Sequence, residues 1–256
     1  MVMELCVLGS GSSGNCAWIG HREGALLLDA GFSYKEIKAR MARAKLDPAR
    51  LRGVVVSHEH SDHVRGLGPL SRALKLPVFI NRLTYEKIHR IIGEVYKVEF
   101  FDTGSDFWVD GIQTHPFSTS HDSVDPSAFV FGVDGRKVGF LTDTGHVTQL
   151  ARSRLAGMDY LVMESNHDRE MLMAGPYPWS LKQRVASRQG HLSNTDCGQL
   201  LEQIYHSGLQ GVTLAHLSET NNNPELARLE AGNALAHRAP YKVATQREPL
   251  GITVIE

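Results

Sequence analysis

Cysteine is scarce in this chain of 256 residues, which has three, at Cys6, Cys16 and Cys197. Their number is odd, they are widely spaced, and no Cys-x-x-Cys pair occurs. These features argue against a disulfide framework and against a four-thiolate zinc site. We therefore expect three reduced thiols in or near the core, as in a cytoplasmic protein.

Long apolar runs and an excess of one charge are also missing. No stretch approaches the roughly 18 uninterrupted apolar residues of a membrane-spanning helix, and the segment 1–14 lacks the basic region of a signal peptide. We therefore expect no contact with membranes. The formal net charge is −1 at pH 7, whereas proteins that coat nucleic acid by bulk electrostatics are strongly basic. Any contact with nucleic acid must therefore be local.

The remaining composition predicts an ordinary globular protein. Apolar residues make up 42% and charged residues 21% of the chain, which argues against disorder and coiled coil. Strands and helices alternate at both ends of the sequence, around a strand-rich middle from about 98 to 141 that includes a hairpin over 129–141. The predicted helices cover 33–44, 64–74, 83–92, 194–206 and 223–236. This order predicts two similar halves packed face to face, in one α/β domain over 1–256 with helix–sheet–sheet–helix layers.

Histidine is abundant, with 13 residues, and several cluster with carboxylates. The strongest cluster follows the apolar run at 53–56 and has the sequence Ser-His-Glu-His-Ser-Asp-His from residue 57. In an extended turn His58 and His60 point the same way and can reach one ion, and Asp62 and His63 can reach a second. Imidazole and carboxylate are ligands for zinc, manganese and iron. The alternative, a solvated polar loop, does not account for four ligand types at this spacing.

Three further ligand candidates stand where predicted strands end. They are His121, Asp143 and His216. Strand ends are the usual place for site residues in α/β folds. Taken singly, each would more often be a surface or hydrogen-bonded residue; taken with the histidine cluster, they predict the rest of a metal site.

In this order the residues resemble the metallo-β-lactamase superfamily pattern of HxHxDH, His, Asp and His, over residues 4 to about 217. The resemblance implies the αββα sandwich. It also implies an aspartate, Asp29, that braces the loop of candidate ligands at 58–63, called the metal loop below. It also implies two divalent ions, zinc or manganese with iron possible, that share a bridging hydroxide as the nucleophile. The implied ligands are His58, His60 and His121 for one ion, Asp62, His63 and His216 for the other, and Asp143 between them. Asp62 is assigned a catalytic role as well.

Two more motifs indicate a branch of the superfamily. The segments 164–168 (Glu-Ser-Asn-His-Asp) and 190–194 (Gly-His-Leu-Ser-Asn) look like motifs of the β-CASP nucleases. However, Asp143 and His191 are only 48 positions apart, so the large β-CASP insertion has no room. The compact YycJ (WalJ-type) group of bacterial metallohydrolases, which resemble 5′→3′ DNA exonucleases, is the better match.

The extra motifs supply candidate substrate-binding residues. His191 is expected to contact a phosphate oxygen or donate a proton to the leaving oxygen. Asn194 or Thr195 is the candidate cap of the helix that follows. The other candidates for substrate contact are Glu164, His167, Ser193 and Asn194. For the histidines the alternative is a purely structural, hydrogen-bonded role.

Weaker signals have plainer interpretations. The G-x-G-x-x-G pattern over 9–14 precedes a strand-like segment rather than a helix, so we predict a turn between strands and no dinucleotide site. The basic segment 35–52 is interpreted as a solvated face, with a track for a phosphate backbone as the alternative. Four cations near the nuclease-like motifs are better candidates for phosphate contact: Arg169, Lys182, Arg184 and Arg188. Tyr177 and Trp179 are predicted to lie in an ordered loop that either stacks on a base or packs.

The favoured function is a dinuclear metal-dependent phosphodiesterase acting on DNA or RNA, most often a 5′→3′ DNA exonuclease in the group that the chain resembles. The alternative is a hydrolase of a small cyclic phosphodiester, lactone or thioester, which the near-neutral charge allows. A third hypothesis is a metal-binding or redox module with two irons. The sequence leaves the oligomeric state open.

Overall fold

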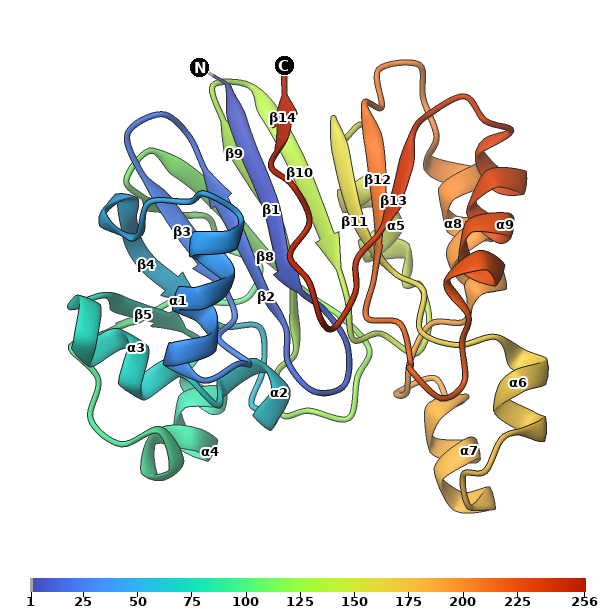
Figure 1. The fold of residues 1–256 in the computed structure, drawn as a ribbon, viewed down its shortest axis with the longest axis horizontal. Helices are drawn as coiled ribbons and strands as arrows, with labels where there is room; N and C mark the ends of the chain where they lie inside the picture. Colours follow the sequence, from blue (N-terminus) through green and yellow to red (C-terminus); the bar gives the residue numbers. More distant parts are fainter. Residues whose placement is uncertain (1) are drawn as a thin grey trace.

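The computed structural model describes residues 2–256, and within them two seven-stranded sheets face each other with helices on their outer sides (Figure 1). The first sheet has the order β14-β1-β2-β3-β4-β5-β6. Its strands are β1 (Met3–Gly9), β2 (Cys16–Gly20), β3 (Ala25–Leu28), β4 (Leu51–Val55), β5 (Pro77–Ile80), β6 (Lys97–Phe100) and β14 (Thr253–Ile255). The second sheet has the order β13-β12-β11-β10-β9-β8-β7. Its strands are β7 (Phe107–Val109), β8 (Ile112–Ser118), β9 (Ser127–Val133), β10 (Arg136–Leu141), β11 (Tyr160–Glu164), β12 (Gly211–Ala215) and β13 (Tyr241–Val243).

The helices form the two outer layers of the predicted αββα sandwich, which the structure confirms. The first sheet is covered by α1 (Tyr34–Arg43), α3 (Leu67–Leu74) and α4 (Arg82–Ile92), with a 3-10 turn at Pro48–Arg50. The second is covered by α5 (Gln149–Leu155), α8 (Asn194–Ile204) and α9 (Pro224–Leu235). The short helices α2 (Ser61–Val64), α6 (Arg169–Ala174) and α7 (Trp179–Val185) lie at one end of the sandwich (Figure 1). No helix within residues 2–256 is long and apolar enough to cross a membrane.

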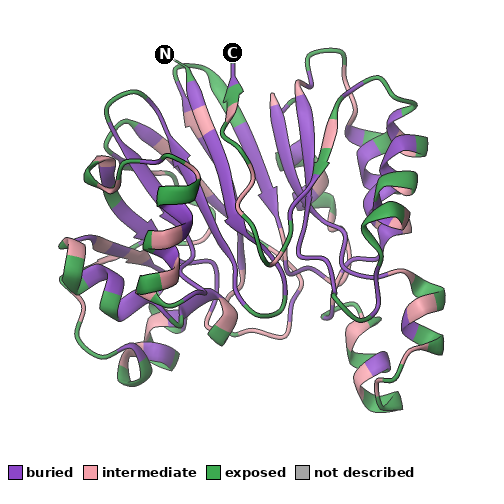
Figure 2. Ribbon diagram, in the orientation of Figure 1, coloured by how far each residue is buried: buried purple, intermediate pink, exposed green. Residues whose placement is uncertain are grey.

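The inner strands β2, β3, β11 and β12 are buried along their whole length, which explains their continuous apolar runs (Figure 2). In β2, Cys16 and Trp18 face the helices, and Ala17 and Ile19 face the second sheet. The alternation follows from the twofold period of a strand. The predicted placement of the cysteines is confirmed, since all three are buried free thiols. The interior is therefore three apolar layers, one between the sheets and one under each helical face.

The turn over 9–14 joins β1 to β2, which are antiparallel neighbours. The prediction of a turn between strands is therefore confirmed. Two strands close the described chain, as expected, but they lie in different sheets. β13 extends the second sheet beside β12, and β14 pairs with β1 in the first, with Glu4 opposite Val254.

The predicted helix over 64–74 is interrupted, and this break shapes the metal loop. α2 ends at Val64 and α3 begins at Leu67. A Cβ atom at Gly66 would lie 2.0 Å from the backbone oxygen of Phe32, so only glycine allows this close approach. Four short helices were not predicted: α5, α6, α7 and α2, whose residues 61–63 belong to the segment that was expected to be an extended turn. Trp179 begins a helix rather than lying in a loop.

Candidate metal centre

The polar cluster lies where the strands of both sheets end. In the first sheet, Asp29 follows β3 and His58 follows β4, and these strands are parallel. In the second sheet β8, β10, β11 and β12 run in one direction, so their carboxyl ends share an edge. His121, Asp143 and His216 follow three of these strands. The topology therefore brings together residues that are up to 187 positions apart in sequence, Asp29 and His216.

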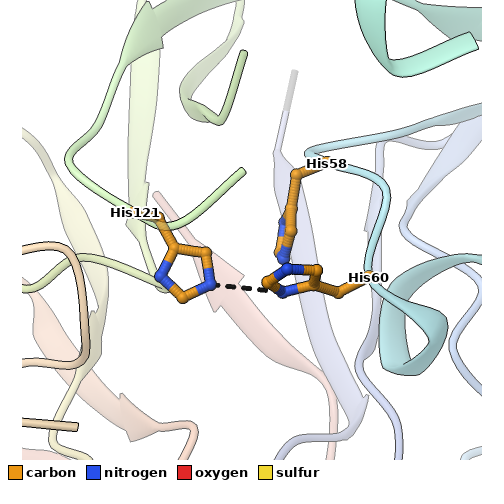
Figure 3. Close-up of side chains that lie close together, drawn as sticks. All are labelled: His58, His60 and His121. Atoms are coloured by element: carbon orange, nitrogen blue, oxygen red, sulfur yellow. Dashed lines mark hydrogen bonds between the residues drawn. The ribbon is translucent and has the colours of Figure 1, made fainter. Parts of the chain in front are cut away.

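The first group of ligand atoms belongs to three histidines, His58, His60 and His121, whose candidate atoms lie within 4.8 Å of one another (Figure 3). His121 Nε2 is 3.3 Å from His60 Nδ1. His121 Nδ1 donates to the carbonyl oxygen of Gly190 at 3.0 Å, so its Nε2 carries the lone pair. In the same way His58 Nδ1 lies 2.9 Å from Ser57 Oγ, which leaves Nε2 free. Two imidazoles of this group are thus held in the tautomer that binds metal.

The second group consists of Asp62, His63 and His216, again within 4.8 Å. His63 Nδ1 donates to Asp29 Oδ2 at 2.7 Å. Its Nε2 therefore faces the cluster, 3.4 Å from Asp62 Oδ2. Asp29 also accepts from the backbone nitrogen and hydroxyl of Ser57, both at 2.8 Å. Asp29 therefore braces the metal loop, as the resemblance implied.

Asp143 lies between the two groups. One of its oxygens, Oδ2, is 3.5 Å from His63 Nε2, and the other, Oδ1, is 3.9 Å from His121 Nε2. Its backbone has a φ of 56°, a left-handed conformation that aspartate tolerates better than most residues. The side chain is 3% exposed. A carboxylate in this place can contact ions in both groups.

Glu164 connects the second group to His191. Its Oε1 accepts from Nδ1 of His191 and from Nδ1 of His216, both at 2.8 Å. Its Oε2 accepts from the backbone nitrogens of Thr144 and Leu192. One oxygen of this fully buried carboxylate therefore fixes two imidazoles, and the other holds two backbone nitrogens. His191 is 22% exposed in its side chain, on the open side of the centre, where it lines a pocket.

The charges of the site favour a cation. Burial opposes protonation of His63, yet the carboxylates of Asp143, Asp29 and Asp62 raise its pKa well above the usual range. Burial likewise opposes protonation of His216, but the carboxylates of Asp143 and Asp62 and the hydrogen bond to Glu164 raise its pKa to about 10. A group of buried carboxylates that raises imidazole pKa values in this way also attracts a divalent ion.

The first group has the opposite tendency. Burial lowers the pKa of His58 well below its usual range, and the neighbouring imidazoles of His63, His121 and His60 lower it further. Burial also lowers the pKa of His121. Neutral imidazoles are the form that binds metal. The two groups therefore differ, one rich in neutral nitrogen and the other in negative charge.

The residues fit a pair of metal ions by a second criterion. Three buried atoms of the cluster have no hydrogen-bond partner within residues 2–256: His58 Nε2, Asp143 Oδ2 and His216 Nε2. An unsatisfied buried polar atom is costly, so such atoms are usually explained by a bound group. All three are nitrogen or oxygen atoms, the donors that zinc, manganese and iron accept.

The remaining predicted substrate residues are placed less favourably. Ser193, rather than Asn194 or Thr195, caps α8, and its hydroxyl accepts from Asp196 N. Asn194 is buried and bonds Ser165 and Asn222. These side chains hold the turn that presents His191 and do not line its open side. His167 is 2% exposed, and its Nδ1 has no partner in the described chain.

The predicted phosphate-binding cations all have internal partners. Arg169 pairs with Asp196, Lys182 with Met173 O, Arg184 with Asp122 and Arg188 with His146. In the basic segment 35–52, Arg40 departs from the expected solvated face. It is 5% exposed and donates to the carbonyl oxygens of Leu8 and Gln246.

Sequence reasoning missed three residues of the site. Asn15 Nδ2 donates to Asp62 Oδ2 at 3.2 Å, and it lies in the turn after the glycine-rich pattern. Asp122 Oδ1 is 3.3 Å from His121 Nε2, one position along the chain from a predicted ligand. Glu59, between two ligands, accepts from the loop that follows His121 through Ser123 Oγ. In the sequence, only their positions next to predicted ligands could have indicated Asp122 and Glu59. Nothing in the sequence indicated Asn15.

Comparison with known proteins gives a consistent result. A family model described as a beta-lactamase superfamily domain matches residues 25–217. The chain is 38% identical over 240 residues to an exodeoxyribonuclease YycJ of Bacillus anthracis, covering 93% of this chain and 91% of that protein. It is 35% identical over 234 residues to the exodeoxyribonuclease WalJ of Streptococcus pneumoniae, covering 90% and 87%.

Solved structures with lower sequence identity share the fold. The metallo-beta-lactamase fold protein YhfI of Bacillus subtilis matches with a TM-score of 0.77 and 18% identity, over 98% of this chain and 99% of that one. Zinc-bound PqqB of Methylobacterium extorquens matches with a TM-score of 0.74 and 19% identity, over 97% and 99%. The short form of human tRNase Z matches with a TM-score of 0.67 and 14% identity, over 99% and 100%.

Proposed function

This chain belongs to the beta-lactamase superfamily, and on that premise we propose that it is a metal-dependent exodeoxyribonuclease that degrades DNA from the 5′ end. The observation that carries the proposal is the pair of ligand groups on either side of Asp143, with His191 next to them. The similarity to two exodeoxyribonucleases over nine-tenths of the chain supports DNA as the substrate. The near-neutral net charge is compatible with a local contact to a DNA end. We propose the cytoplasm as its location.

Two divalent ions fit the site in this proposal. His58, His60 and His121 would hold one, Asp62, His63 and His216 the other, and Asp143 would contact both. Zinc and manganese both suit this donor set, and iron is compatible with it. When bound, such a pair activates a water molecule as the nucleophile and stabilises the charge on the phosphoryl oxygens.

Residues around the ligands hold those ligands in position, and one of them supplies a proton. Asp29 and Ser57 orient the imidazoles of His63 and His58, and Asn15 holds Asp62. Glu164 fixes His191 through Nδ1, so Nε2 is free to give a proton to the 3′ oxygen that leaves when the phosphodiester bond breaks. His191 is thus the proposed proton donor, and Glu164 its positioning residue. Ser193 and Asn194 act by holding the turn rather than by touching DNA.

We propose a single domain over residues 1–256 without a β-CASP insertion. Pairing of β14 with β1 supports this, because it joins the two ends of the described chain in one sheet.

The test is metal content together with cleavage of 5′-labelled and 3′-labelled DNA by the intact protein and by Asp143→Ala. Two ions per chain and release of the 5′ label first are expected, with loss of cleavage by about 100-fold or more in the variant. The matched control is Asp102→Ala, at an exposed position, which should cleave like the intact protein. Two bound ions without cleavage of DNA would contradict the proposed function and favour a small ester or phosphodiester substrate.

A further inference from the structure

A pocket opens beside His191, under the short helix α7. Residues of six segments line it, including Tyr177 before α7, Leu181 and Arg184 within α7, and Asn221 after β12. Figure 1 shows α6 and α7 standing away from the two sheets at the end where the metal loop lies. The pocket is therefore next to the ligand cluster but is not formed by metal ligands.

The side chain of Asn221 has no internal role. It is 1% exposed, and neither its Oδ1 nor its Nδ2 has a hydrogen-bond partner within residues 2–256. A buried amide normally satisfies both atoms, so an unpaired one indicates a missing partner. The turn after α6 comes close to this amide, since a Cβ atom at Gly175 would lie 2.6 Å from its Oδ1.

The neighbouring amides show that the unpaired state is specific to Asn221. Asn222 Nδ2 donates to the carbonyl oxygens of Ser165 and Asn166 at 2.8 and 3.0 Å. Asn166, which also lines the pocket, donates from Nδ2 to His216 O at 2.8 Å. The local backbone can therefore satisfy an amide, but it leaves that of Asn221 unpaired within residues 2–256.

The charges of the pocket favour a neutral ligand. Arg184 and Asp122 are both lining residues, and they pair with each other, with Nη2 and Oδ2 2.5 Å apart. His191 is engaged by Glu164. No other acidic or basic side chain lines the pocket in the part of the chain that the structure describes. A phosphate would need an unpaired cation there, so the pocket does not suit one.

The side chains that line the pocket favour a flat ligand. Tyr177 offers an aromatic ring, and Leu181 and Val185 of α7 offer aliphatic surface. A planar group with donors and acceptors on its edge and an apolar face matches both this wall and the amide of Asn221. A nucleobase has this chemistry.

We propose that this pocket holds the nucleobase of the terminal nucleotide, with its edge on the amide of Asn221 and its face on the ring of Tyr177. The proposal rests on the proposed function, because it assumes that the site acts on nucleic acid. It adds a base-binding contact to a reaction whose chemistry concerns only the phosphate backbone.

The test measures binding of the four deoxynucleoside 5′-monophosphates and of 2-deoxyribose 5-phosphate to the metal-loaded protein by calorimetry. We expect the nucleotides to bind about tenfold more tightly than the sugar phosphate, as base stacking and edge contacts contribute in other sites. Asn221→Ala and Tyr177→Ala should each remove most of this difference without weakening binding of the sugar phosphate. Tyr177→Phe, which keeps the ring, should retain it.

The matched control is Asn233→Ala, at an exposed position of α9, which should bind like the intact protein. Thermal melting and metal content show whether each variant is folded. If Asn221→Ala does not fold, Tyr177→Ala alone decides. Equal affinity of the intact protein for nucleotides and sugar phosphate would overturn the proposal, as would an undiminished preference in Tyr177→Ala.

Cleavage of DNA by the same samples separates this proposal from the proposed function. Cleavage without a preference for nucleotides would reject the base pocket and keep the nuclease. A preference for nucleotides without cleavage would keep the pocket and reject the nuclease.

Discussion

Glu164 Oε1 accepts a hydrogen bond from His216 Nδ1 at 2.8 Å. The same oxygen accepts from His191 at the same distance, so one carboxylate orients a metal ligand and a proton donor. Burial alone would raise the pKa of Glu164, but its interactions with His191 and His216 keep it well below the usual range. The carboxylate therefore stays charged in the folded protein at any pH where the protein works.

Glu164→Gln tests this double role. The amide keeps one acceptor oxygen but replaces the other with a donor, and because each oxygen accepts two of the four hydrogen bonds, two of them are lost. We expect metal affinity to fall about 10- to 100-fold, as for other residues that orient metal ligands, and cleavage to fall with it. Metal retained after dialysis, measured by elemental analysis, checks this. Glu202→Gln, at an exposed position of α8, is the control, and unchanged metal retention in Glu164→Gln would refute the role.

Asp29→Asn tests whether the charge of Asp29 holds His63, because the substitution keeps the left-handed backbone conformation and removes the charge. Asp29 has a φ of 62°, which asparagine also tolerates, but asparagine lacks the charge that holds His63. We expect a loss of metal affinity of about 10-fold or more with little change in the fold. The control is Asp110→Asn, at another left-handed position, where the carboxylate pairs with the exposed Arg52. Equal metal affinity in both variants would contradict the bracing role.

Gly31→Ala tests the close packing behind the metal loop. A Cβ atom there would lie 1.6 Å from the backbone oxygen of Asp62 and 2.5 Å from the backbone nitrogen of Asn15. Backbone must move to admit it, so we expect the free energy of unfolding to fall by about 2 kcal/mol or more and metal affinity to fall as well. Chemical denaturation and metal retention are the measurements. Gly251→Ala, where no atom lies within 4 Å, should change neither.

Because His167 is buried, we expect the free energy of unfolding to fall in acid. Burial lowers its pKa from about 6.5 to about 4 in the folded state. Below pH 6.5 the unfolded chain therefore binds a proton that the folded chain does not, and stability falls as the pH drops from 6.5 to 4. The loss is up to about 3 kcal/mol for this one group.

His167→Gln, which cannot titrate, should make the dependence of unfolding free energy on pH less steep in that interval. Denaturation of both proteins between pH 4 and 8, in the presence of a chelator, measures the slopes. The same slope in both would show that His167 does not remain neutral.

Much of the centre could be predicted because its residues follow simple local rules. His58, His60, Asp62 and His63 are close in sequence, so any tight turn keeps them near each other. The more distant ligands follow strands, and parallel strands end at one edge. The helix cap was misassigned because three residues in a row at 193–195 can cap a helix, and only the structure shows that Ser193 does.

Other features depend on contacts between distant segments. Asn15 reaches Asp62 across 47 positions, and an asparagine after a glycine-rich turn carries no sign of this. The helices α6 and α7 escaped prediction because Gly175, Pro176 and Pro178 interrupt any helical pattern between them. The sequence gives no sign of Asn221 either, because this residue is distinguished by a side chain that has no hydrogen-bond partner within residues 2–256.

The pairing of β14 with β1 affects when the first sheet can finish folding during synthesis. Ribosomal synthesis proceeds from β1 towards β14, so the edge of the first sheet stays open until Thr253–Ile255 have left the ribosome. His216 also emerges late, after more than four-fifths of the chain. Such non-local pairing is slow to form, and the predicted ligand set is incomplete until His216 has been synthesised. A chain that folds in this order gains its complete metal centre only after both sheets have been synthesised almost entirely.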